Sequence, residues 1–210
     1  CALPISRRMK PLEIASKCKS LETLDRKITE CDACSRLVEW RTEVSQIKRR
    51  AYADQKYWGK PVTGFGPMNA KVVIVGLAPG AHGANRTGRI FTGDSSGDWL
   101  YRSLFNNGLA KIETSSSRRD GQELFDTRIT CAVRCAPPGN KPLPSEIAEC
   151  SPWLQREFQL LFSTSRSYLA LGAIGWRAII DTLRSLDEEL PRKLPKFSHR
   201  SEEHTSELQS

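Results

Sequence analysis

Long hydrophobic runs are missing from this 210-residue sequence. No apolar stretch approaches the roughly 18 residues of a membrane-spanning helix, and no apolar signal-peptide core opens the chain. We therefore expect no membrane association and a cytoplasmic location. Internal repeats and low-complexity segments are missing too, so length and composition indicate one soluble globular domain with a full core.

Acidic residues are fewer than basic ones, 24 Asp and Glu against 32 Lys and Arg, which gives a net charge of +8. An excess of this size favours a polyanionic partner, with nucleic acid as the first choice. A solvated basic surface is the alternative. Basic residues gather at 48–50, at Arg86 with Arg89, and at 118–119. Arg86 and Arg89 lie within the suspected site described below, and their charges favour a substrate that carries phosphate.

Apolar runs alternate with amphipathic segments along the chain, which predicts an α/β fold. Expected strands cover 71–75, 125–133 and 167–171, and expected helices cover 20–29, 35–47, 95–107, 144–162 and 173–186. Ser35, and Ser95 or Ser96, are the expected caps of two of these helices. Strands that alternate with helices indicate a three-layer α/β/α sandwich around a central parallel sheet. We expect an arm over 1–19 and the domain over 20–199.

A loop rich in glycine, Gly76 to Asp94 with the sequence GLAPGAHGANRTGRIFTGD, follows the first expected strand. Ligands of α/β proteins bind at the carboxyl ends of parallel strands, so this loop is the predicted site. Its small residues let backbone N–H groups approach a substrate, while His82, Asn85, Arg86 and Asp94 offer reactive side chains. The loop has neither a GxGxxG run nor a P-loop Gly-Lys-Ser/Thr, which argues against a nucleotide-binding enzyme.

Seven cysteines in a chain without a secretory signal indicate metal or cluster binding rather than disulfides. Cys31-x-x-Cys34, Cys135 and Cys150 form a possible four-thiolate set, suited to zinc or to a [4Fe–4S] cluster. Buried structural cysteines are the alternative. Cys131 lies about 13 Å from Cys135 along an extended strand, too far for one cluster, and is expected in the pocket or core. Cys1 and Cys18 are interpreted as incidental.

These features together resemble the iron–sulfur uracil-DNA glycosylases of family 5, the B-type branch. The matching stretches are Cys31-x-x-Cys34, Tyr57–Pro61, Gly64–Gly66, Gly76–Asp94, Ala132–Pro138 with Asn140–Pro142, and Cys150–Trp153. The resemblance implies a uracil-DNA glycosylase-like sandwich and a hydrolase of base excision repair. Such an enzyme flips uracil out of DNA and hydrolyses its N-glycosidic bond. It also implies a structural [4Fe–4S] cluster on Cys31, Cys34, Cys135 and Cys150, and we expect a monomer.

Site residues are assigned on this basis. Phe91 matches the aromatic residue that stacks on the flipped base, and Asn140 falls in a segment associated with base and water contacts. The expected base-binding set is Gly76, Leu77, Ala78, Gly80, Phe91, Cys131 and Asn140. Asp94 is the candidate for orienting the water, with His82 and Asn85 as alternatives, and Arg86 and Arg89 are expected to contact DNA phosphates.

Alternatives for these side chains remain open. His82 could be a hydrogen-bonded part of the loop scaffold, and Asn85 and Arg86 could brace the loop. Cys131 stands where the A-type branch carries a base-reading Asn. A small residue there would admit bases beyond uracil, such as hypoxanthine.

The end of the sequence departs from the family pattern. A second catalytic motif, His-Pro-Ser, is expected after one more strand and is not found near His199 or His204. Residues 200–210 match a translated sequencing adapter, with a natural disordered tail as the alternative. We expect the last strand to be missing, and the chain to fold poorly and to have little activity. The alternative function is a non-catalytic nucleic-acid-binding module with a structural zinc site made of four cysteines.

Overall fold

A computed structural model describes residues 8–186, 190 and 196–201. Three parallel strands, β1 (Val72–Gly76), β2 (Thr127–Cys131) and β3 (Ser167–Ala170), lie in the order β2-β1-β3. β1 is therefore central, as its continuous run of buried residues requires. The predicted parallel sheet and the α/β fold class are confirmed.

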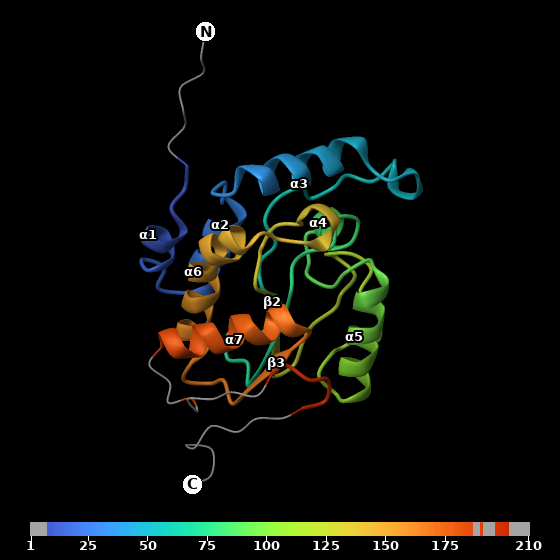
Figure 1. The fold of residues 1–210 in the computed structure, drawn as a ribbon. Coiled ribbons are helices and arrows are strands. Elements are labelled where there is room, and N and C mark those ends of the chain that lie inside the picture. The colour runs from blue at the N-terminus through green and yellow to red at the C-terminus, as the bar shows by residue number, and fades with distance from the viewer. Residues whose placement is uncertain (1–7, 187–189, 191–195, 202–210) are drawn as a thin grey trace.

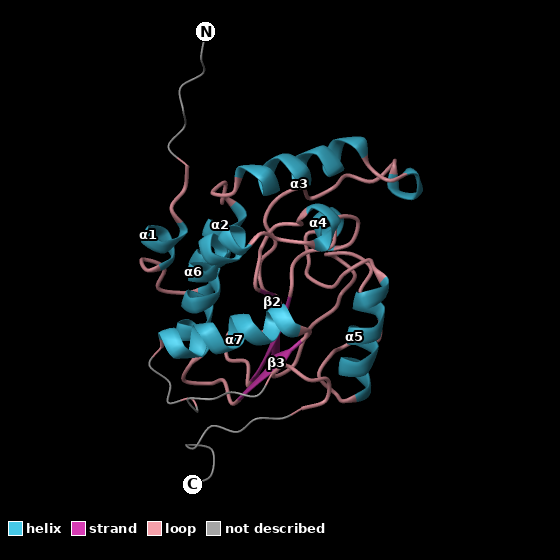
Figure 2. Cartoon of the chain, viewed as in Figure 1, coloured by secondary structure: helices cyan, strands magenta, loops and turns pink. Residues whose placement is uncertain are grey.

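Helices surround this sheet on both sides, as Figures 1 and 2 show. The α-helices of the described residues are α1 (Pro11–Ala15), α2 (Leu21–Thr29), α3 (Ser35–Ile47), α4 (Ala84–Thr87), α5 (Ser95–Asn106), α6 (Pro144–Leu161) and α7 (Ala173–Ser185). Two 3-10 helices, η1 (Arg50–Tyr52) and η2 (Pro138–Asn140), complete the set. All three predicted strands and all five predicted helices are found within a few residues of their expected bounds.

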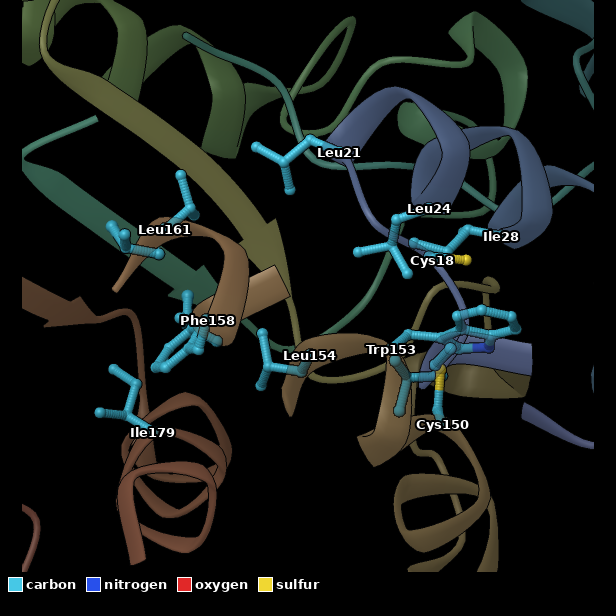
Figure 3. Packing of buried hydrophobic residues seen from close by; sticks show 14 of the residues in the cluster. Cys18, Leu21, Leu24, Ile28, Cys150, Trp153, Leu154, Phe158, Leu161 and Ile179 are labelled. Carbon is cyan, nitrogen blue, oxygen red and sulfur yellow. The ribbon is translucent and has the colours of Figure 1, made fainter. Parts of the chain in front are cut away.

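The two faces of β1 belong to different hydrophobic clusters. Val73 and Val75 pack with residues of α2, α6 and α7, whereas Ile74 packs with residues of α5 and the glycine-rich loop. Figure 3 shows the first cluster, in which Trp153 and Cys150 of α6 lie beside α2. Side chains alternate across a strand, so one apolar run serves both faces. The result is the predicted three-layer arrangement.

The segment predicted as an arm contributes to this core in its described part. α1 lies beside α6 (Figure 1), and Ala15 and Cys18 are each only 2% exposed within the first cluster. Cys18, interpreted as incidental, is thus a core residue. Cys1 lies outside the described residues, as does most of the tail predicted over 200–210.

Two details of helix capping differ from the sequence prediction. Asp94, not Ser95 or Ser96, is the N-cap of α5, and its carboxylate accepts from the Gly97 N–H at 3.0 Å. Cys34, not Ser35, stands at the N-cap position of α3 and provides no side-chain cap. The first difference matters for function, because it gives the proposed catalytic carboxylate a structural task.

A buried ion network attaches α6 to β2. Glu157 is fully buried and accepts from Arg128 Nε at 2.6 Å, from Thr130 Oγ1 at 2.7 Å, and from Arg134 Nη2. Burial alone raises the pKa of a carboxyl group, but the two arginines lower the pKa of Glu157 to about 2. Glu157 therefore stays ionised, and its charge is balanced within the core.

The outer edge of β2 is covered by a loop residue. Phe65 pairs with Ile129 in an antiparallel bridge with both hydrogen bonds formed, at 2.9 and 2.8 Å. This places segment 63–67, which contains the Gly64–Gly66 motif, against the sheet. Gly64 packs against the Glu157–Arg128 pair so closely that an added Cβ would overlap the carboxylate.

Candidate active site

The glycine-rich loop begins where β1 ends, next to the end of β2. Gly76 of β1 is in register with Cys131 of β2. A Cβ added to Gly76 would lie 2.8 Å from Phe91 Cζ and 3.3 Å from Cys131 Sγ. Glycine at this position therefore lets the aromatic ring lie directly on the strand end. The structure brings together three of the predicted base-binding residues.

Phe91 is held in an unusual backbone conformation. Its φ of +48° lies in the left-handed region, where an aromatic residue is strained. Gly97 of α5 packs against the Phe91 carbonyl, and a side chain at Gly97 would overlap that oxygen. Such strain is found where the surrounding structure fixes a functional side chain. Phe91 as a whole is only partly buried, so the residue is accessible from the solvent.

The two carboxylate oxygens of Asp94 have different neighbours, one in helix α5 and one in the glycine-rich loop. Oδ1 caps α5, while Oδ2 lies against Gly80 and Gly83 of the loop. A Cβ on Gly80 would stand 3.2 Å from Oδ2, and a Cβ on Gly83 would overlap it. The two glycines bring the loop backbone up to Oδ2 of Asp94, a residue that is partly exposed. A carboxylate oxygen can accept a hydrogen bond from water.

The loop also offers backbone donors. Among the described residues, the N–H groups of Leu77, Ala78 and Gly80 have no hydrogen-bond acceptor within the protein. All three residues are partly exposed. Free N–H groups beside a strand end can bind an electron-rich ligand such as a carbonyl oxygen.

His82 is fixed by a tyrosine from the YWGKP motif. Its Nδ1 lies 3.0 Å from the Tyr57 hydroxyl, and the two rings meet edge to face. Burial, together with the charges of Arg49 and Arg86, lowers the pKa of His82. The imidazole is therefore neutral at pH 7. This arrangement agrees with the alternative role of His82, a hydrogen-bonded part of the loop scaffold.

Asn85, an alternative catalytic residue, is 0% exposed. Its Nδ2 donates to the carbonyl oxygens of Arg41 and Ala81, at 3.3 and 3.4 Å, and its Oδ1 is buried without a partner. A residue so enclosed does not reach a substrate. The structure disagrees with a catalytic role and agrees with the bracing role.

The predicted phosphate contacts of Arg86 and Arg89 also disagree with the structure, because these side chains are 9% and 4% exposed. The Arg86 guanidinium binds the carbonyl oxygens of His82 and Gly93 and the Gln55 amide, and lies 3.9 Å above the Tyr52 ring. The Arg89 guanidinium binds Thr92, Ser115 and Asp120. Both arginines fix the loop from inside, because their hydrogen-bond partners lie within the protein.

Asn140 lies apart from these contacts. It is exposed at the end of η2 with a φ of +57°. Within the described residues, no hydrogen bond joins it to Gly76, Phe91 or Cys131. Its expected base contact stays a prediction.

The four cysteines assigned to a cluster meet at one small cavity. Cys31 and Cys34 come from the segment between α2 and α3, Cys135 from the segment after β2, and Cys150 from α6. Burial, with the charges of neighbouring thiolates, raises the pKa of Cys34 to about 12 and of Cys135 to about 11. Four such thiols become stable thiolates only when a cationic group binds them. The donor set therefore fits a metal-containing group.

Positive charge is buried beside this cavity. Arg41 Nη1 donates to Cys135 Sγ at 3.0 Å, and the Arg134 backbone N–H donates to Cys150 Sγ at 3.3 Å. Arg41 Nε and two nitrogens of the Arg134 guanidinium are buried without a hydrogen-bond partner. This surplus of donors and charge matches a group that carries net negative charge, as an iron–sulfur cluster with four thiolates does.

A single metal ion fits the four cysteines less well. Four thiolates around one zinc ion stand about 3.8 Å apart, given a Zn–S distance of about 2.3 Å. In the described part of the chain, no three His, Cys, Asp or Glu side chains are arranged to hold one metal ion. A [4Fe–4S] cluster binds each thiolate through a separate iron and does not need this convergence. Cys131 belongs to the other hydrophobic cluster, on the opposite face of the sheet.

A larger cavity, of about 560 Å³, lies at the covered edge of β2 and was not predicted from the sequence. Its walls include Asp25, segment 63–67, Arg118, Phe125 and Arg128. Burial, opposed by Arg128, raises the pKa of Asp25 to about 6. None of the predicted catalytic residues lines this cavity, so we do not assign the chemistry to it.

Sequence reasoning also missed Arg41 and Tyr57 as site residues. Tyr57 stands in a quoted motif, but nothing in that motif shows its contact with His82. Arg41 lies on the predicted helix over 35–47 and follows Cys34 by seven residues, about two helical turns, so it is expected on the side of the helix that faces Cys34. That spacing is the one signal that could have found it.

Comparison with known proteins gives a consistent family assignment. The Uracil DNA glycosylase superfamily matches residues 63–206. A Type-5 uracil-DNA glycosylase of Mycobacterium leprae is 50% identical over 180 residues, which cover 86% of this chain and 77% of that protein. A Type-5 uracil-DNA glycosylase of Mycobacterium bovis is 50% identical over 167 residues, 80% of this chain and 62% of that protein.

Similarity to another type is weaker. A Type-4 uracil-DNA glycosylase of Pyrobaculum aerophilum is 34% identical over 136 residues, 64% of this chain and 61% of that protein. The comparisons give no support to the non-catalytic zinc module or to the expectation of impaired activity. No helix of the described residues is long and apolar enough to cross a membrane.

Proposed function

The chain belongs to the uracil-DNA glycosylase superfamily, in its type-5 group, and we propose that it removes uracil from DNA by hydrolysing the N-glycosidic bond. The observation that carries this proposal is the meeting of Gly76, Phe91 and Cys131 at the carboxyl ends of β1 and β2. This is where α/β proteins bind their ligands, and an aromatic ring there suits a planar base.

Binding begins with a base flipped out of the duplex. Its flat face stacks on the Phe91 ring, which the strained backbone holds over Gly76. Carbonyl oxygens of the base accept hydrogen bonds from the free N–H groups of Leu77, Ala78 and Gly80. These donors become stronger partners as the base gains negative charge, so they favour the transition state over the bound substrate.

Cleavage needs a water molecule at the sugar. Asp94 Oδ2 accepts a hydrogen bond from this water and directs its oxygen toward C1′. The C1′–N bond breaks as the new C–O bond forms, and the base leaves with the bonding electron pair. The attacking water loses one proton, which balances the proton that the departing base takes up. The developing positive charge on the sugar is stabilised by the nearby carboxylate. His82, held by Tyr57, shapes the loop that carries these groups.

Phosphate contacts come from exposed cations next to the loop. Arg49 lies near enough to His82 for its charge to lower the pKa of that residue, and both Arg49 and Arg50 are exposed. They take the place of Arg86 and Arg89 in the DNA interface, because only exposed guanidinium groups reach a phosphate backbone.

A [4Fe–4S] cluster is the cofactor that best suits Cys31, Cys34, Cys135 and Cys150. When bound, it supplies structural cross-linking and no redox chemistry to bond cleavage. The four cysteines join α3, the segment after β2, and α6. The monomeric state and the cytoplasmic location stay predictions.

Base preference depends on Cys131. Burial raises the pKa of its thiol to about 12, so this wall of the pocket is small, neutral and a weak hydrogen-bond donor. Such a wall does not select the pyrimidine edge of uracil, and we propose that hypoxanthine is also excised. Comparable release of both bases from synthetic duplexes is the expected result, and strict selection of uracil would contradict it.

The central proposal is tested by single-turnover release of uracil from a duplex, with the cysteine group loaded. We expect release by the parent chain and rates lowered about 100-fold or more by Phe91→Ala and Asp94→Asn. Asparagine can still cap α5, so the second variant keeps the helix. Phe125→Ala and Asp98→Asn, at exposed positions, are the matched controls. No release by the loaded parent, or equal rates for all four variants, would overturn the proposal.

A further inference from the structure

Arg41 is the one residue of α3 with hydrogen bonds to both the cysteine group and the glycine-rich loop among the described residues. Its side chain is 7% exposed. Nη1 donates to Cys135 Sγ at 3.0 Å, and Nη2 donates to the Cys31 carbonyl oxygen at 3.1 Å. The guanidinium therefore connects two cysteine-bearing segments that are far apart in sequence.

The backbone of the same residue holds the loop. The Arg41 carbonyl oxygen accepts from Asn85 Nδ2 at 3.3 Å, a hydrogen bond that is buried at both ends. Asn85 belongs to α4, inside the loop that runs from Gly76 to Asp94. A displacement of Arg41 would thus act on the loop without any contact to the base or to DNA.

The charge of Arg41 needs an anionic partner. Within the described residues Arg41 forms no ion pair with a carboxylate, and its Nε has no acceptor. The guanidinium donates only to a cysteine sulfur and a carbonyl oxygen, so its buried charge faces no carboxylate of the described residues, and an uncompensated buried charge is costly. Deprotonated cysteines that hold an iron–sulfur cluster supply this compensation.

We propose that Arg41 is a positioning residue that couples the four-cysteine group to the glycine-rich loop. The guanidinium is the counter-ion of the cysteine-held group, and the backbone carbonyl transmits the position of α3 to α4 through Asn85. This rests on the proposal that the cysteines hold an iron–sulfur cluster. Loss of the cluster therefore loosens α4 at a distance from the cysteines.

The experiment uses the full chain, loaded with iron and sulfide and purified without oxygen. The first readout is the rate at which visible iron–sulfur absorbance is lost in a chelator. The second is hydrogen exchange at the amides of 83–88. Neither readout requires uracil excision, so they test this coupling separately from the proposed activity.

Arg41→Met should lose its absorbance about 10-fold to 100-fold faster than the parent, as expected for removal of an outer-shell partner. Arg36→Met is the matched control on the same helix. Arg36 pairs with Glu146 at 2.7 Å and donates its side-chain hydrogen bonds to Glu146 and Lys141 rather than to a cysteine, so the parent rate is expected. The amides of 83–88 should exchange faster in Arg41→Met and in the parent stripped of its cluster.

Two further variants keep the proposal open to refutation if Arg41→Met does not fold. Asn85→Ala should retain absorbance at the parent rate while the amides of 83–88 exchange faster. Arg41→Lys keeps the charge without the two-pronged contact and should lose absorbance several-fold faster than the parent. The proposal is overturned if Arg41→Lys and Arg41→Met match the parent rate, or if cluster removal leaves exchange at 83–88 unchanged.

Discussion

The Arg89 guanidinium and the Asp120 carboxylate form a buried ion pair, with Nη2 and Oδ2 2.5 Å apart and side chains 4% and 10% exposed. Burial by itself raises the pKa of Asp120, but the hydrogen bond from Arg89 and three backbone N–H groups lower it to about 2. The pair fixes the end of the glycine-rich loop to segment 115–120, and it makes folding sensitive to acid.

Asp120→Asn should lower the free energy of unfolding, and this effect should be largest above pH 4. An unfolded Asp titrates near pH 3.9, so the stabilisation is complete above that value and is lost as pH falls through about 2. We expect the parent to exceed the variant by about 2 to 3 kcal/mol in free energy of unfolding at neutral pH. Urea unfolding at a series of pH values measures the difference, and a gap that stays constant between pH 4 and pH 2 would contradict the assignment.

Asp25→Asn should show the opposite dependence. The pKa of Asp25 in the folded protein, about 6, is higher than that of an unfolded Asp. The folded state therefore binds an extra proton between these values, and its contribution to stability is lost as pH rises from about 4 through about 6. The variant should gain stability relative to the parent across this window, by about 2 to 3 kcal/mol. Thermal or urea unfolding at pH 4 and pH 7 checks the sign.

Gly83→Ala and Gly80→Ala test whether the position of the Asp94 carboxylate matters, because they would displace it by different amounts. A Cβ on Gly83 would overlap Asp94 Oδ2, whereas a Cβ on Gly80 would stand 3.2 Å from the same atom. We expect Gly83→Ala to lower the excision rate about 100-fold and Gly80→Ala to lower it several-fold at most. Single-turnover rates give the comparison. Equal effects of the two substitutions would show that Oδ2 is not the atom that matters.

Among substitutions that remove a single charged group, Glu157→Gln should lower the free energy of unfolding the most. It leaves Arg128 and Arg134, both buried, without their shared carboxylate. Breaking a buried pair in this way costs about 3 to 5 kcal/mol. Glu123→Gln, which removes the exposed pair with Lys111, is the control and should leave the unfolding midpoint unchanged. A similar midpoint for both variants would refute the central place of Glu157.

Elements that depend on local pattern were predictable from the sequence. The apolar run before Gly76 became β1, and the amphipathic segments became helices near their expected bounds. The glycine-rich loop was located at the strand end for the same reason. In these cases neighbouring residues determine the outcome, so a single sequence contains the information.

Contacts between distant segments were not predictable in the same way. Arg86 and Arg89 were expected at the DNA because arginines in a site loop suit phosphate. Instead, the Arg86 guanidinium binds Gln55 and the Arg89 guanidinium binds Asp120, and each partner is 31 positions away along the chain. Asp94 was expected to act on water, but its position as cap of α5 emerges only when the helix start is known. The meeting of four cysteines likewise rested on resemblance, since spacing alone left zinc and iron–sulfur open.

The bridge between Phe65 and Ile129 hinders intermolecular strand pairing at the edge of β2. A free strand edge exposes unpaired amides that can recruit a strand from another molecule and begin aggregation. At the middle of β2 both backbone groups of Ile129 are already occupied by a loop of the same chain. Intermolecular sheet growth at this edge would first have to displace Phe65, so the loop that borders the larger cavity also blocks the addition of a foreign strand to β2.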